Sequence, residues 1–199
     1  AFGKREPDFR FQTRRCANRL FSDDHDERRA IVRFGEKGAL AAQALAFTLD
    51  GVPLVYNGME AGDTAESGAP ALFEKLPIFW AFAERRPEFP RFYKEMIRLR
   101  KNSIALRRGD LTWLKNSDES KVLSFVRRSG NEEVLVAINI TNTPFFGAVE
   151  VSGNYEEITP NIGAPLPPDD DKTKAKTNAN AALPSLSLES FGFRIFRKK

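Results

Sequence analysis

The sequence predicts a mixed α and β fold, in which parallel βα units precede an antiparallel β-sandwich. Strand, helix and strand follow one another between residues 19 and 56, which is the order of a βαβ unit. At Gly109 the period of the apolar residues changes from that of a helix to that of a strand. Short strands separated by turn signals follow, as in a sandwich. We therefore expect two domains, residues 1–107 and 108–199.

The first of these domains contains apolar runs of two lengths. The short runs suit strands, and the second short run, at 52–56, resembles a parallel strand that is covered on both faces. The longer runs repeat at helical spacing, and Asp50-Gly51 ends the first of these helices. The predicted elements are a strand at 19–22, a helical turn at 31–34 that ends near Gly35, a helix at 36–49, a strand at 52–56, an irregular segment at 64–89 and a helix at 88–101.

The second domain alternates apolar and polar residues in short segments. Ser129-Gly130-Asn131 is a hairpin signal between two of them. A polar segment over residues 160–182, with Pro165, Pro167, Pro168 and an acidic run, predicts a long loop. The predicted strands are 111–115, 121–127, 133–139, 145–151 and 155–159, with a final strand or strand pair at 186–196.

Composition excludes several classes of function. The net charge is +4, but the 31 basic and 27 acidic residues are scattered, which indicates a solvated surface and no nucleic-acid partner. No apolar run is long enough to cross a membrane. The single cysteine, Cys16, excludes an internal disulfide and a cysteine-based zinc site, but it leaves the compartment unknown. No signal peptide is visible, and the start at Ala1 resembles a processed or cut end.

One stretch, residues 21–30, carries the strongest chemical signal. It begins at the end of a predicted strand and holds the only histidine of the chain inside a run of carboxylates: Phe21-Ser22-Asp23-Asp24-His25-Asp26-Glu27-Arg28-Arg29-Ala30. In barrel enzymes, chemistry takes place at the carboxyl ends of the strands. A carboxylate beside a histidine can hold a sugar hydroxyl and oppose developing positive charge. The alternative is a solvated acidic turn, in which an aspartate or serine caps the following helix.

The order of four segments resembles the α-amylase family (glycoside hydrolase family 13). His25-Asp26 after a strand, and Gly51-Val52-Pro53-Leu54-Val55-Tyr56-Asn57-Gly58-Met59-Glu60 one helix later, are similar to the last two βα units of that family's TIM barrel. Phe92–Lys101 resembles the last barrel helix, and Val122–Asn142 resembles the C-terminal β domain. The resemblance implies a remnant of a (β/α)8 barrel followed by a sandwich domain.

The resemblance also implies a function. The family hydrolyses or transfers α-linked glucans such as starch and maltooligosaccharides with retention, which requires a nucleophile and a general acid/base. Asp26 matches the acid that stabilises the cationic transition state, His25 matches a histidine that binds sugar hydroxyls, and Glu60 matches a substrate-side loop residue after strand eight. Asp24 stands where the family usually has Asn, which affects the hydrogen bonding around Asp26.

The nucleophile and the acid/base of the family lie on earlier barrel strands. We therefore expect the chain to be the C-terminal portion of a glucan-active enzyme and to be inactive alone, so that its standing as an enzyme is open. We expect no cofactor and no metal. The acidic run Asp169-Asp170-Asp171 is interpreted as a solvated loop, and Asn139-Ile140-Thr141 as a weak glycosylation signal within a strand.

Two other classes of function remain open. A non-catalytic carbohydrate-binding module could stack sugars on Trp113 or Tyr155, although such aromatic residues more often belong to a sandwich core or are half buried. A structural or partner module could instead use the incomplete barrel as a docking face, with self-association as its sign. Family membership alone does not decide among these classes.

Overall fold

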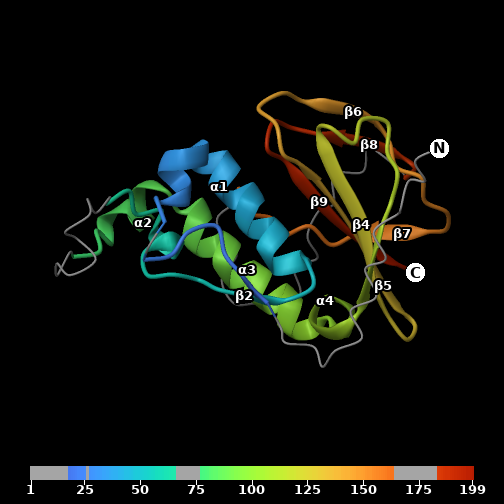
Figure 1. Ribbon diagram of the computed structural model, residues 1–199, viewed down its shortest axis with the longest axis horizontal. Coiled ribbons are helices and arrows are strands. Elements are labelled where there is room, and N and C mark those ends of the chain that lie inside the picture. Colours follow the sequence, from blue (N-terminus) through green and yellow to red (C-terminus); the bar gives the residue numbers. More distant parts are fainter. Residues whose placement is uncertain (1–17, 26, 66–76, 164–182) are drawn as a thin grey trace, which may run out of the picture.

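The computed structural model describes residues 18–25, 27–65, 77–163 and 183–199. The long helices gather at one end of the molecule and the strands of the antiparallel sheets at the other (Figure 1). The predicted mixed α and β fold with an antiparallel sheet is confirmed. None of the described helices has the length and apolar character that a membrane crossing requires.

The first described elements form the predicted βαβ unit. Strand β1 (Arg19–Leu20) pairs in parallel with β2 (Val52–Pro53), and helix α1 (Ala30–Thr48) connects them. Both strands are shorter than the sequence predicted. The prediction that they are buried is wrong, because Val52 is 51% exposed and Val55 and Phe21 are also exposed. The reason is that the described residues place no further strand beside this pair.

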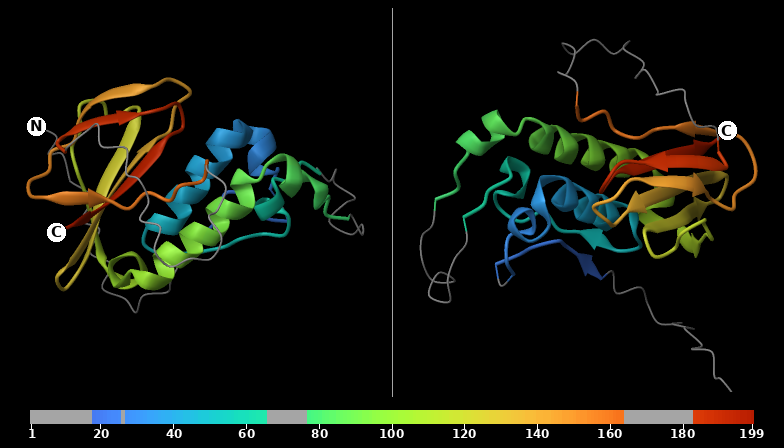
Figure 2. Two further views of the ribbon diagram at one scale, coloured as in Figure 1. Left: turned by 180° about the vertical axis from the view of Figure 1, so that it is seen from behind. Right: turned by 90° about the horizontal axis from the view of Figure 1, so that it is seen from above.

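Helix α1 contains the predicted helical turn and the predicted helix in one element. Gly35 separates the two parts with φ 71° and ψ 174°, a conformation that only glycine adopts without strain. After this kink, the helix buries an alanine-rich face that includes Leu40, Ala44 and Phe47. Figure 2 shows α1 between the β1–β2 pair and the other long helix.

That other helix, α3 (Glu88–Asn102), confirms the predicted helix at 88–101. It buries Phe89, Phe92, Tyr93 and Met96 against α1. The ring of Phe47 packs edge-on against Phe92 and Tyr93, with centroids 6.4 and 6.3 Å apart. This aromatic stripe, Phe89, Phe92 and Tyr93, is therefore part of the core. Three short helical elements complete this half: η1 (Met59–Ala61), α2 (Ala81–Arg85) and α4 (Ile104–Arg108).

The second half is an antiparallel sandwich of a larger and a smaller sheet. The larger sheet has the order β3-β4-β5-β9-β7, and β6 pairs with β8 in the smaller one. The predicted final segment is a pair of strands that belong to different sheets. The bounds are β3 (Asp110–Trp113), β4 (Val122–Ser129), β5 (Glu132–Asn139), β6 (Phe145–Ala148), β7 (Tyr155–Glu157), β8 (Ser185–Leu188) and β9 (Phe193–Lys198).

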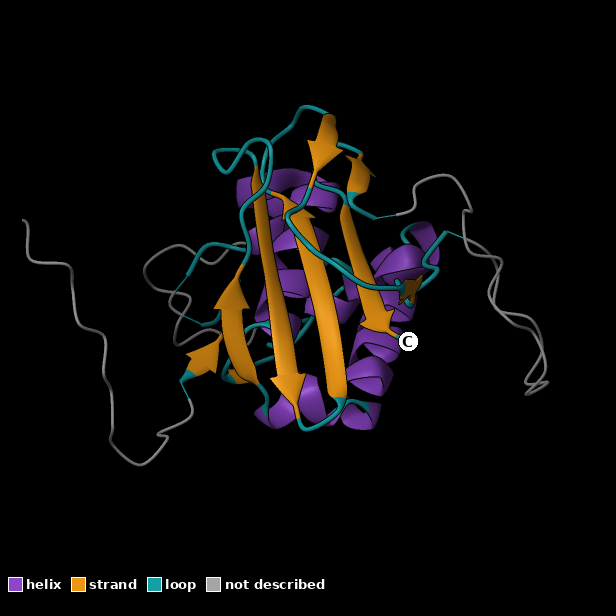
Figure 3. Ribbon diagram, turned by 90° about the vertical axis from the view of Figure 1, so that its right-hand side faces the viewer, coloured by secondary structure: helices purple, strands orange, loops and turns teal. Residues whose placement is uncertain are grey.

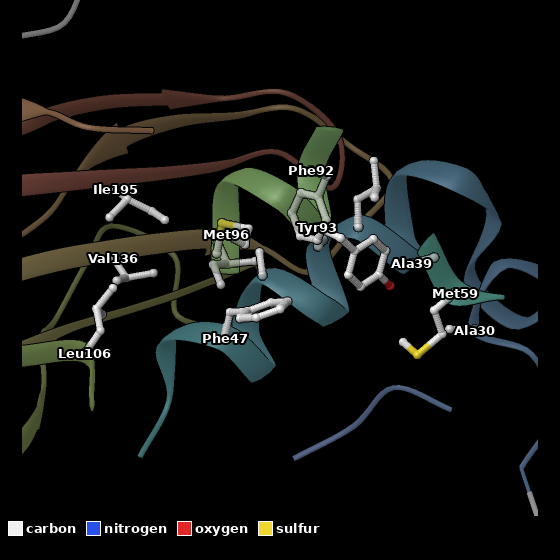
Figure 4. Packing of buried hydrophobic residues seen from close by; sticks show 14 of the residues in the cluster. Ala30, Ala39, Phe47, Met59, Phe92, Tyr93, Met96, Leu106, Val136 and Ile195 are labelled. Carbon is white, nitrogen blue, oxygen red and sulfur yellow. The ribbon is translucent and has the colours of Figure 1, made fainter. Parts of the chain in front are cut away.

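Both faces of the larger sheet are covered, which explains the nearly continuous apolar run of β5. Leu135 and Ala137 point into a cluster shared with the β6–β8 sheet. Val134, Val136 and Ile138 point into the main core, which also contains α1, α3 and α4. The helices behind the strands are visible in Figure 3, and Figure 4 shows Val136 and Ile195 facing the helical residues. The main core therefore extends across residue 107, where the domain boundary stays a prediction.

Candidate functional site

The segment after β1 begins with a buried aspartate. Asp23 is 2% exposed, and its Oδ2 atom accepts a hydrogen bond of 2.8 Å from the amide of Ala30, the first residue of α1. The bond gives a partner to the first amide of α1 from seven residues earlier, although the N-cap residue itself is Arg29 and Asp23 is not solvated. Burial raises the pKa of Asp23, against the lowering effect of the Ala30 amide and of the Arg29 charge.

The predicted sugar-binding residue His25 lies further along this segment and is exposed. Beside it, Asp24 accepts a hydrogen bond of 3.1 Å from the amide of Glu27, which forms a tight turn. Asp26, the predicted transition-state stabiliser, lies outside the described residues, and its role stays a prediction. The turn thus presents His25 to solvent while its first residue, Asp23, is buried.

The segment after β2 carries the third predicted site residue. Gly58 has φ 84° and precedes η1, in which Glu60 is the central residue. A Cβ atom at Gly58 would lie 2.9 Å from the Cβ of Asp63 and 3.0 Å from Nη2 of Arg29. The glycine therefore serves both the turn and the close approach of the two segments.

Arg29 joins the two segments. Its Nε atom donates to the backbone oxygen of Asp63 at 3.2 Å and lies 3.6 Å from Oδ2 of Asp23. Its guanidinium group lies over the ring of Tyr56, 5.3 Å from the centroid. Because Arg29 is only 7% exposed, these contacts act in a largely water-free environment, where charges interact more strongly.

A small pocket lies beside this arginine. Its lining includes Asp23, Arg29, Asp63, Met59 and Tyr93. In Figure 4, the hydroxyl of Tyr93 points away from Phe47, toward the side where Met59 and Ala30 lie. Burial, together with the nearby negative charges, raises the pKa of Tyr93 far above its usual range. Tyr93 therefore stays a neutral phenol that can donate a hydrogen bond.

Three buried polar atoms of the described residues have no hydrogen-bond partner. They are Oδ1 of Asp23, Nη2 of Arg29 and Oε2 of Glu60. Such atoms are rare in folded proteins, and each marks a place where a water molecule, an ion or a ligand group can bind. The structure thus brings Asp23, Arg29 and Tyr93 together at one pocket, while His25 and Glu60 are not among its lining residues.

Sequence reasoning did not single out three of these residues. It treated Asp23 as one of a run of acids, Arg29 as surface charge and Tyr93 as part of an apolar stripe. The available signal for Tyr93 was its hydroxyl on an otherwise buried helix face, because a buried tyrosine usually finds a polar partner. No comparable signal exists for Asp23, since its burial depends on α1.

The two aromatic candidates, Trp113 and Tyr155, are not among the residues that line this pocket. No group of three or more His, Cys, Asp or Glu within the described ranges is arranged to hold a metal ion. Cys16 and the acidic run at 169–171 lie outside these ranges. Trp113 is 57% exposed and packs edge-on against Phe125, so it does not belong to the core. Tyr155 is half buried and donates a hydrogen bond to Glu133.

Asn139, the asparagine of the weak glycosylation signal, has a structural role. The Asn139 side chain is buried and donates hydrogen bonds to the backbone oxygens of Thr143 at 2.7 Å and Glu189 at 2.9 Å. Its amide nitrogen is thus occupied within the sandwich, where it ties together two loops.

Two short parallel strands joined by a helix, with polar loops after both strands, precede an antiparallel sandwich. Comparison with known proteins shows what this arrangement is similar to. Residues 113–194 match the family model described as the C-terminal all-beta domain of alpha amylase. The predicted resemblance is confirmed: this chain is similar to the C-terminal part of the α-amylase-family enzymes.

Sequence relatives include Alpha-amylase 2 of Dictyoglomus thermophilum, 31% identical over 146 residues, or 69% of this chain and 25% of the relative. A cyclomaltodextrinase of Geobacillus thermopakistaniensis is 34% identical over 95 residues, 48% of this chain and 16% of the relative. The chain therefore spans a quarter or less of the length of these two relatives.

Solved structures share the fold at lower identity. Isomaltulose synthase from Klebsiella sp. LX3 has a TM-score of 0.65 at 20% identity, covering 92% of this chain and 43% of that one. The alpha-amylase from H. orenii has a TM-score of 0.65 at 19% identity, covering 91% and 40% of the two chains. At these identities the likeness concerns the fold.

Proposed function

We propose that the chain is the C-terminal portion of a retaining α-glucan-active hydrolase or transglycosylase, with starch-like or maltooligosaccharide substrates. One observation carries the proposal: the polar segments with His25 and Glu60 follow two strands that pair in parallel, so both leave the same edge of the sheet. That edge is the active end of a barrel. The similarity to an alpha-amylase and a cyclomaltodextrinase supports the substrate class.

The roles follow from the chemistry of the reaction. Asp26 would oppose the positive charge of the oxocarbenium-like transition state, and His25 would hydrogen-bond sugar hydroxyls from its exposed position. Glu60 would act from the neighbouring loop on the substrate side. A retaining reaction also needs two carboxyl groups about 5–5.5 Å apart as nucleophile and acid/base. The resemblance assigns neither role to a residue of this chain, so we expect no turnover by the chain alone.

The test combines turnover and binding. Reducing-sugar release from soluble starch should be absent for the chain and for Asp26→Asn, whereas release that depends on Asp26 would overturn the proposed inactivity. Retardation in a native gel that contains starch, but not in one with dextran, should be lost in His25→Ala. Retardation that persists in His25→Ala would contradict the proposed sugar-binding role.

A carbohydrate-binding module without catalysis is the second candidate. The exposure of Trp113 favours it, because an exposed indole offers a flat apolar face for stacking on a sugar ring. In the same gel, this candidate predicts that Trp113→Ala abolishes retardation and that His25→Ala does not. The two substitutions therefore separate the two candidates.

A partner module is the third candidate, supported by the exposed apolar residues around the β1–β2 pair. Phe21, Val52 and Val55 are all exposed there, and such a patch can be covered by a second copy of the chain. Sedimentation should then show dimers that Val52→Lys disrupts. Phe146→Ser is the control, because Phe146 is also exposed but belongs to β6 in the sandwich. A monomer at all concentrations would exclude this candidate.

A further inference from the structure

In the sequence, two buried charged residues flank the turn with His25. Asp23 precedes the turn and Arg29 follows it, and both are more than nine-tenths buried. Removing a charge from water costs free energy unless specific partners compensate. Their partners therefore indicate what the two residues do.

Asp23 closes the turn on itself. One of its carboxylate oxygens, Oδ2, holds the amide of Ala30 and lies within ion-pair distance of Arg29. The residues on both sides of the turn are thereby fixed to each other and to the first turn of α1. A segment closed in this way has few alternative backbone conformations.

Arg29 connects the closed turn to the Glu60 loop. It donates to the backbone of Asp63, lies over the ring of Tyr56 and approaches Gly58, where a side chain would collide with it. These contacts hold the turn after β1 against the loop after β2. The two loops are therefore positioned as one unit.

Two of the unpartnered atoms belong to residues that line the small pocket. Nη2 of Arg29 is a donor and Oδ1 of Asp23 is an acceptor, and both are buried. A water molecule in the pocket can accept a hydrogen bond from the first atom and donate one to the second. The hydroxyl of Tyr93, which also lines the pocket, is a further possible partner for this water.

We propose that Asp23 and Arg29 are positioning residues, which hold the turn with His25 against the Glu60 loop through a buried polar network that one bound water molecule completes. The meaning of this positioning for sugar chemistry rests on the proposed function. The network itself does not, and it can be tested without a sugar.

The single histidine makes the test direct. Because His25 is the only histidine of the chain, its imidazole gives one set of resonances in an NMR spectrum. Asp23→Asn keeps the size of the side chain and removes its charge. The matched control is Glu27→Gln, which removes the same charge at the same separation of two residues from His25, but on an exposed side chain paired with Arg33.

Asp23→Asn should move and broaden the His25 resonances and speed amide hydrogen exchange across residues 24–29 by at least about tenfold, since local opening becomes easier. Glu27→Gln should leave the exchange rates of these amides unchanged. Arg29→Lys is the second variant. It keeps the positive charge but loses the guanidinium contacts, so it should loosen the turn as Asp23→Asn does.

Two results would overturn the proposal. The first is that the His25 resonances and the amide exchange rates of Arg29→Lys are the same as those of the wild type. This result would overturn the proposal even if Asp23→Asn does not fold. The second is an absence of cross-relaxation between bound water and the Tyr93 ring protons, which would remove water from the network. Neither readout involves glucan binding, so failure of the proposed function would remain a separate result.

Discussion

Substitution of Arg127 by methionine should destabilise the protein more than substitution of any exposed arginine. Arg127 lies in β4 and is fully buried. Its Nη1 atom donates to the backbone oxygen of Thr48 at 2.8 Å, and its Nη2 atom donates to that of Gly109 at 2.8 Å. The contact with Asp50, at 3.4 Å, involves a largely exposed carboxylate and contributes little.

The expected magnitude follows from these two carbonyl groups. Methionine replaces the apolar part of the arginine but cannot donate, so both oxygens lose a donor in a buried place. Each buried acceptor without a partner costs about 1–3 kcal/mol, so the free energy of unfolding of Arg127→Met should fall by about 2–6 kcal/mol. The lysine of Arg127→Lys can reach one of the two oxygens, so its free energy of unfolding should lie between those of the wild type and of Arg127→Met.

Urea denaturation followed by tryptophan fluorescence and circular dichroism measures this difference. Arg33→Met is the matched control, because it makes the same change in an ion pair with Glu27 that is exposed on both sides. The control should lose at most about 1 kcal/mol. Equal midpoints for Arg127→Met and Arg33→Met would refute the reasoning.

Three further predictions concern a turn, a charge and the core. Gly58→Ala should lower the free energy of unfolding by about 1–3 kcal/mol, measured by urea denaturation, because alanine is strained at φ 84° and collides with the neighbouring segment. For Glu133, burial raises the pKa, but hydrogen bonds from Tyr155 and Arg128 outweigh it and the pKa is lowered. A carboxyl group whose pKa is lowered in the folded state stabilises above its unfolded pKa of about 4.3, and this contribution is lost as the pH falls. The stability difference between wild type and Glu133→Gln should therefore be largest near neutral pH and shrink below pH of about 4; a constant difference would contradict this account. Ile138→Ala, at a fully buried position in β5, should cost about 2–5 kcal/mol by the same assay, and a loss below about 1 kcal/mol would show that the core collapses around the cavity.

The sequence predicted the fold where the residue pattern had one physical cause. The period of 3.6 over residues 88–101 required one buried helix face, and α3 has it. The apolar run at 133–139 was predicted as a strand, and β5 occupies it, covered by the helices on one face and by the smaller sheet on the other. The helix α4 was missed, because its five residues are too few to show a period and its cap, Ser103, is a common residue.

The candidate site was less predictable, because its geometry depends on contacts between distant segments. The motif around His25 indicated a chemistry but not which acid of the run is buried. Asp23 is buried because its carboxylate binds the start of α1, seven residues later. The prediction that the first two strands are buried was wrong for the same reason. The run at 52–56 has the composition of a covered strand, but the residues of a strand do not show which other segments lie over it.

Arginine gives the most general example. The scattered basic residues were interpreted as a solvated surface, yet Arg29 and Arg127 are buried, and Arg100 lies partly buried with its pKa lowered to about 10 by burial and by Arg127. The last carbonyl groups of a helix need donors from elsewhere. At the end of α1, Arg100 donates to the oxygens of Phe47 and Gly51, and Arg127 donates to that of Thr48.

These arginines come from α3 and β4, on opposite sides of the predicted domain boundary. The end of α1 lies between the helical layer and the sheet, where water is scarce and a guanidinium group is the side chain with most donors. Arg29, at the start of α1, donates instead to the backbone oxygen of Asp63 in the neighbouring loop. Whether an arginine is buried therefore depends on the carbonyl groups to which it donates. These groups can be identified only once the helix and its neighbours are placed together.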